Sequence, residues 1–139
     1  MPSRIFFDTA PIIYFLDKSP LYFDRMKNFL YKTANEYSQF YTSVITDMEY
    51  LAAPYKRQEQ KKIDNYFAFQ NYLDIKKIDI NTEIASYAGQ LRSKYDFLKG
   101  LDALQIAACH FFECDSFVTN DKALLQVTEI KNPLLVDNI

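Results

Sequence analysis

Short apolar runs alternate along the chain with longer segments of helical periodicity. Residues 4–7 form a brief apolar run that ends at an aspartate, as expected of a buried strand. Residues 80–98 place apolar side chains every three or four positions, which is the spacing of one face of a helix. Gly100 separates this segment from the next helix. The other segments predict strands over 39–43, 75–78, 116–119 and 134–136, and helices over 11–18, 21–36, 45–53, 57–73, 101–112 and 122–126.

The order of these elements predicts an α/β fold. Strands that alternate with helices form a parallel sheet, and the crossover helices cover both of its faces. Pro54 is expected to end the helix over 45–53, because proline has no backbone N–H to donate. No linker or repeat interrupts the pattern, and 139 residues suit a single domain over 1–139.

Composition narrows the classes of function. The chain carries 16 Lys and Arg against 18 Asp and Glu, a formal net charge of -2, and 49% of its residues are hydrophobic. A chain with this share of apolar residues is not intrinsically disordered, because burial of its apolar side chains can offset the entropy lost on folding. The slightly acidic balance excludes a protein that holds nucleic acid by bulk positive charge.

The remaining composition indicates a cytoplasmic location. The most apolar stretch, residues 5–16, is too short to cross a membrane and contains Asp8. The start of the chain lacks the apolar core and cleavage site of a signal peptide. Cys109 and Cys114 are expected to be reduced, buried thiols. His110 is the only histidine, so a histidine-based catalytic or metal site is not expected.

Four acids fall where the predicted elements meet one edge of the sheet. Asp8 and Asp121 follow strands, Asp102 opens an apolar helix, and Glu49 lies on the helix after the second strand. Each has an ordinary structural role available, as a helix cap, a turn residue or a solvated charge. Asp8 is the hardest to explain in that way, because a carboxylate among apolar residues is costly without a partner.

Convergent carboxylates repel one another unless a cation compensates them. Mg²⁺ and Mn²⁺ favour such oxygen ligands. Metal ions bound in this way activate water for phosphodiester hydrolysis. The sequence therefore predicts a metal site with Asp8, Glu49, Asp102 and Asp121 as ligands. Four charges assigned to that site leave a net charge of +2 on the rest of the chain, since -2 + 4 = +2.

Four segments taken in order resemble the signatures of the PIN domain family. They are Phe6-Phe7-Asp8-Thr9, Ser43-Val44-Ile45-Thr46-Asp47-Met48-Glu49, Leu101-Asp102-Ala103-Leu104-Gln105-Ile106-Ala107-Ala108 and Phe117-Val118-Thr119-Asn120-Asp121. The chain is similar, within this family, to the VapC-like ribonuclease toxins of toxin–antitoxin pairs. One departure is the turn before the fourth strand, where Glu113-Cys114-Asp115 replaces the glycine that relatives often have.

The resemblance implies a three-layer α/β/α sandwich with a five-stranded parallel sheet. It implies that Asp8, Glu49, Asp102 and Asp121 bind Mg²⁺ or Mn²⁺ and catalyse RNA cleavage. Thr9, Thr119 and Asn120 would be supporting polar residues. It also implies an RNA substrate, a cognate antitoxin and a homodimer. Candidate RNA-binding cations outside these motifs are Lys56, Arg57, Lys61, Lys62, Arg92 and Lys99, and Asp47 is expected to face solvent.

Other functions remain open at this point. A PIN nuclease of RNA maturation needs no antitoxin, and a binding module could keep the fold without catalysis. A haloacid-dehalogenase phosphatase also begins with an acid after an apolar strand. That chemistry requires a second aspartate two residues later, where this chain has Ala10.

Overall fold

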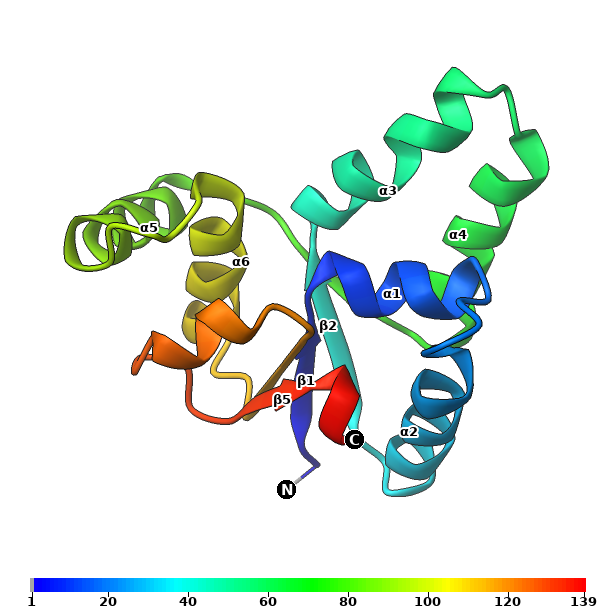
Figure 1. Ribbon diagram of the computed structural model, residues 1–139, viewed down its shortest axis with the longest axis horizontal. Coiled ribbons are helices and arrows are strands. Elements are labelled where there is room, and N and C mark those ends of the chain that lie inside the picture. Colours follow the sequence, from blue (N-terminus) through cyan, green and yellow to red (C-terminus); the bar gives the residue numbers. More distant parts are fainter. Residues whose placement is uncertain (1) are drawn as a thin grey trace.

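A five-stranded parallel sheet lies at the centre of the computed structural model, which describes residues 2–139 (Figure 1). The strand order is β3-β2-β1-β4-β5, and every neighbouring pair is parallel. The predicted α/β fold with a five-stranded parallel sheet is therefore confirmed. The strands are β1 (Arg4–Phe7), β2 (Gln39–Ser43), β3 (Lys76–Ile78), β4 (Ser116–Thr119) and β5 (Pro133–Leu135).

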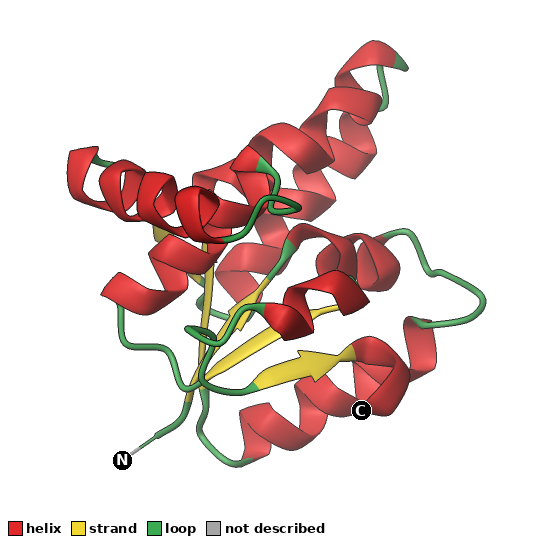
Figure 2. Ribbon diagram, turned by 60° about the vertical axis from the view of Figure 1, so that its left-hand side comes forward, coloured by secondary structure: helices red, strands yellow, loops and turns green. Residues whose placement is uncertain are grey.

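Helices cover both faces of this sheet (Figure 2). None of the helices within residues 2–139 is long and apolar enough to cross a membrane. The α-helices are α1 (Thr9–Leu16), α2 (Phe23–Asn35), α3 (Val44–Lys56), α4 (Gln60–Tyr72), α5 (Thr82–Lys94) and α6 (Gly100–Phe111), and the 3-10 helices are η1 (Lys122–Gln126) and η2 (Val136–Asn138).

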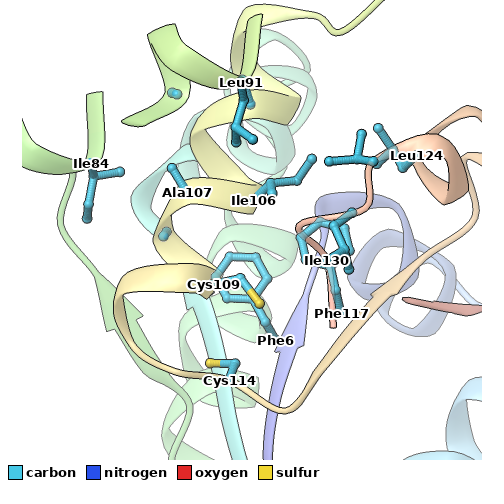
Figure 3. Close-up of a cluster of buried hydrophobic side chains, with 14 of the residues drawn as sticks. Phe6, Ile84, Leu91, Ile106, Ala107, Cys109, Cys114, Phe117, Leu124 and Ile130 are labelled. Carbon is cyan, nitrogen blue, oxygen red and sulfur yellow. The ribbon is translucent and has the colours of Figure 1, made fainter. Parts of the chain in front are cut away.

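Alternating strand residues supply two separate hydrophobic cores, as the two-residue period of a strand requires. Phe6 and Phe117 stack with ring centroids 5.4 Å apart and pack with α5 and α6 on one face (Figure 3). Phe7 and Val118, one position later, pack with α1 to α4 on the other face. The result is the three-layer sandwich in which β1 and β4 are buried on both sides.

Most helix boundaries differ from the prediction by one to four residues, and two of these differences have a clear physical reason. Helix α3 continues past Pro54 to Lys56, because Pro54 removes only its own N–H and Arg57 still donates to the Ala53 carbonyl at 3.0 Å. Pro54 is buried, so tertiary packing supports this turn. Helix α5 ends at Lys94, where Tyr95 takes an extended conformation although the apolar spacing continues.

The predicted exposure of Asp47 is also wrong. The Asp47 carboxylate accepts a hydrogen bond from the Tyr66 hydroxyl at 2.7 Å and pairs with the Lys77 ammonium at 3.0 Å. These contacts join α3, α4 and β3. Asp47 therefore has a structural role at the edge of the sheet, and it lies on a different side of α3 from Glu49.

Candidate active site

Asp8 is the first residue after β1 and lies at the carboxyl edge of the sheet. It caps α1, with its Oδ1 atom accepting the backbone N–H of Thr9 at 2.9 Å. Its Oδ2 atom accepts the hydroxyl of Thr119, the last residue of β4, at 2.9 Å. Asp8 is only 9% exposed, and hydrogen bonds from α1 and β4 hold both of its carboxylate oxygens in place.

Glu49 reaches the same edge from α3, which begins immediately after β2. The Thr9 hydroxyl donates a hydrogen bond to Glu49 Oε1 at 2.6 Å. Thr9 therefore holds two acids at once, Asp8 through its backbone N–H and Glu49 through its side chain. The acids come from segments about 40 residues apart, and the parallel topology brings them together.

Asp102 and Asp121 approach from two further elements. Asp102 lies in the first turn of α6, but the residue that caps this helix is Lys99, so the alternative role as a cap does not apply to Asp102. An acid at this end of a helix is favoured by the helix dipole. Asp121 does cap a helix, because its carboxylate accepts the N–H of Ala123 in η1 at 3.0 Å.

The charges of these acids affect one another. Burial, and then repulsion from Asp102 and Glu49, raise the pKa of Asp8 to about 6 although the hydrogen bonds from Thr119 and Thr9 oppose this shift. Burial also raises the pKa of Asp102, with repulsion from Asp121 and Glu49 adding to it and Lys99 opposing it. Burial is the larger cause in both cases, and the added repulsion reflects the closeness of these carboxylates to one another.

Three of the acids open into a cavity of about 720 Å³. Glu49, Asp102 and Asp121 line it together with Arg92 and Lys99. Within residues 2–139 neither of these two cations forms an ion pair. The other wall is formed by α5, where the exposed Ala85 and Gly89 and the buried Ala88 are small and leave room.

The donor set fits a hard divalent cation, because every candidate ligand is a carboxylate oxygen. Within residues 2–139, however, no three acidic, histidine or cysteine side chains lie close enough together to hold a metal ion. Mg²⁺ is usually held by one or two carboxylates, with waters and substrate phosphates completing its shell. The acids therefore fit such an ion in their chemistry, and they are not assembled into a closed protein cage.

Several predicted site residues lie elsewhere. Asn120 points away from the acids, since its side chain contacts the Tyr14 hydroxyl at 3.4 Å and accepts the N–H of Asp137 at 3.3 Å. Four of the predicted cations belong to the α3–α4 hairpin, which extends from the sheet and does not line the cavity (Figure 1). These are Lys56, Arg57, Lys61 and Lys62.

The prediction overlooked a buried polar network beneath the acids. Gln105, which is 1% exposed, contacts Thr9, Ser43 and Thr46. One signal was available in the sequence, because Gln105 is a polar residue in the middle of the apolar run over 103–108. Its partners depend on the packing of α6 against the ends of β1 and β2, which the local pattern does not contain.

Comparisons with known proteins agree with this architecture. The PIN domain family pattern matches residues 5–130. A chain of the VapBC2 structure from Rickettsia felis, solved bound to a DNA fragment from their promoter, is 20% identical, with a TM-score of 0.76 over 95% of this chain and 98% of that chain. No curated protein sequence is a significant match.

Two more solved structures share the fold. A chain of a toxin–antitoxin complex from Klebsiella pneumoniae is 20% identical, with a TM-score of 0.68 over 97% of this chain and 99% of that chain. A chain of FitAcB from Neisseria gonorrhoeae is 17% identical, with a TM-score of 0.67 over 97% and 99%. The family pattern covers most of the sequence, and the chain belongs to the PIN domain family.

Proposed function

We propose that this PIN domain is a metal-dependent endoribonuclease and the toxin of a toxin–antitoxin pair. The observation that carries the proposal is that Asp8, Glu49 and Asp102 lie near one another at one sheet edge, where a cation would offset both the burial of their charges and the repulsion between them. Asp121 lines the cavity together with Glu49 and Asp102. Asp8, Glu49, Asp102 and Asp121 are the proposed ligands of Mg²⁺ or Mn²⁺.

The proposed reaction is hydrolysis of an RNA phosphodiester bond. Mg²⁺ or Mn²⁺ bound at such carboxylates supplies an activated water and neutralises charge that develops on the phosphate. The chain's own contribution is orientation. Thr119 and the Thr9 backbone fix Asp8, and the Thr9 hydroxyl fixes Glu49. Arg92 and Lys99 supply positive charge for the RNA backbone beside these acids.

A cognate antitoxin, a homodimer and a cytoplasmic location belong to the same proposal. The antitoxin is supported by the solved structures that share the fold, of which one is a VapBC2 complex and another a toxin–antitoxin complex. A small antitoxin gene beside the gene for this protein would separate the toxin from a PIN nuclease of RNA maturation.

Metal removal tests the enzymatic proposal. Purified protein incubated with cellular RNA is expected to produce defined new ends in Mn²⁺, to stop cutting in excess EDTA, and to resume when Mn²⁺ is restored. The same ends should be found by sequencing RNA after brief expression in cells. Cleavage that persists in EDTA contradicts the mechanism, and RNA binding without cleavage indicates a non-catalytic module.

Reversal of the cavity cations tests how RNA is held. We expect the double substitution Arg92→Glu and Lys99→Glu to weaken RNA binding and to reduce the slope of log K against log[salt] by about 2, because each lost phosphate contact removes about one unit. The matched control is Lys56→Glu with Lys61→Glu on the α3–α4 hairpin. An unchanged slope in the cavity variant, or an equal reduction in the control, would show that RNA does not bind beside the acids.

A further inference from the structure

Gln105 occupies the centre of a hydrogen-bond network just below the candidate active site. Its side-chain nitrogen donates to the hydroxyls of Thr46 at 3.0 Å and Thr9 at 3.3 Å, and its carbonyl oxygen accepts the Ser43 hydroxyl at 2.5 Å. All four side chains are buried. A buried polar group without a hydrogen-bond partner is costly. The hydroxyls and the amide of this network must therefore donate and accept hydrogen bonds in one consistent pattern.

Ser43 fixes which way the amide of Gln105 points. The Ser43 oxygen accepts the backbone N–H of Ile45 at 3.1 Å as the cap of α3, and its hydrogen goes to Gln105 Oε1. The amide nitrogen must then face Thr9 and Thr46. Gln105 is therefore a donor, and not an acceptor, towards both threonines.

The hydroxyl hydrogen of Thr9 then has two acceptors left, Glu49 Oε1 at 2.6 Å and the Thr46 hydroxyl at 3.1 Å. The Gln105 amide nitrogen donates to the Thr9 oxygen and cannot accept from it, and the carboxylate of Glu49 is both closer and a stronger acceptor than a hydroxyl, so the Thr9 hydrogen goes to Glu49 Oε1. A glutamine turned the other way would present its carbonyl oxygen to Thr9 and compete with Glu49 for that hydrogen. The orientation of the Gln105 amide therefore affects Glu49, a proposed metal ligand, through the side chain of Thr9.

We infer that Gln105 is a positioning residue for the metal site, one that acts through Thr9 to hold Glu49 for a divalent cation. This inference rests on the proposed function. Groups that orient metal ligands in this way typically change metal affinity or activity by 10- to 100-fold when they are removed. Glu49 itself is exposed, so without the Thr9 hydrogen bond its side chain would be free to turn into solvent.

The test is the affinity of the RNA-free protein for Mn²⁺, measured by calorimetry. Gln105→Met keeps the length of the side chain and removes the amide, and we expect it to weaken Mn²⁺ binding about tenfold. The matched control is Gln70→Met. Gln70 is another buried glutamine, but its amide contacts Asp47 and Lys77, away from the acids, so its loss should change Mn²⁺ affinity less than about twofold.

A double-mutant cycle tests the route through Thr9. Thr9→Val removes the hydroxyl and should itself weaken Mn²⁺ binding, and the further change Gln105→Met should then add nothing, because coupled residues are not additive. Losses that add in full overturn the inference. Gln105→Asn, which shortens the amide by one methylene, replaces the methionine variant if that protein does not fold, and the same loss is expected.

The inference and the proposed function fail in different ways. Wild-type Mn²⁺ affinity in the Gln105 variant, together with lost affinity in Asp102→Asn, overturns the role of Gln105 and leaves the metal site intact. Wild-type affinity in Asp102→Asn overturns the metal site itself. Circular dichroism and thermal melting of each variant establish that the compared proteins are folded.

Discussion

The substitution Asp102→Asn is expected to reduce Mn²⁺-dependent RNA cleavage at least about a hundredfold while the fold is retained. Bound metal contributes several kcal/mol to such reactions, and each 1.36 kcal/mol corresponds to a factor of ten in rate. The fold should survive because Asp102 does not cap α6 and its ionised form is opposed by burial and by neighbouring acids. An amide at this position removes the charge and nearly preserves the shape.

The matched control is Asp96→Asn, which neutralises an exposed acid in the turn after α5. Cleavage rates of an end-labelled RNA and Mn²⁺ binding should be unchanged in this control. Asp102→Asn should lose both, with a melting temperature no lower than that of the wild type. Full activity of the Asp102 variant would exclude this acid from the metal site.

The substitution Gly89→Leu is expected to move stability and activity in opposite directions. Gly89 lies within α5, where glycine costs about 1 kcal/mol relative to a good helix former. A Cβ atom at Gly89 would meet open space beyond its own helix, so the first atom of a larger side chain is accommodated there. We therefore expect the melting temperature to rise by about 3–5 °C.

The same leucine would fill space between α5 and the acids. Gly89 lines the cavity that contains Glu49, Asp102 and Asp121. If RNA approaches through this cavity, cleavage should fall at least about tenfold, which corresponds to only about 1.4 kcal/mol of lost transition-state binding. The variant Gly89→Ala should gain the same stability with a much smaller loss of activity. A second control is Gln90→Leu, which changes an exposed residue of α5 that does not line the cavity and should leave cleavage normal. A stable Gly89→Leu protein with a normal rate would place the substrate path elsewhere.

The strands could be predicted from the sequence because strands buried on both faces read as continuous apolar runs. β1 and β4 have the predicted boundaries. The helix ends were less predictable, because Pro54 and Tyr95 follow tertiary packing and not local pattern. Pro54 stays inside a helix since its ring is buried, and α5 stops although Tyr95 continues the apolar period.

The positions of the candidate acids could be predicted because Asp8 and Asp121 follow strands, Asp102 lies in the first turn of a helix and Glu49 lies on the helix after β2. The residues that orient them could not be assigned in the same way. Gln105 and Asp47 have partners more than 15 residues away in sequence, and which oxygen meets which hydrogen is decided only when the elements pack. Repulsion among the acids could be foreseen from the sequence. The hydrogen bonds by which Thr9 orients both Asp8 and Glu49 could not.

The burial of Asp8 has a consequence for how the protein withstands changes in acidity. Its pKa is about 6 when folded and near 3.8 otherwise, so the folded state keeps a proton that the unfolded chain releases between these values. The free energy of unfolding therefore falls as pH rises from about 4 to 6, by about 3 kcal/mol from this group, and stays lower above that window. A bound cation would recover part of this loss, because ligands that bind only the native state stabilise it. At neutral pH the metal-free protein is thus less stable because Asp8 carries the charge that the proposed metal site requires.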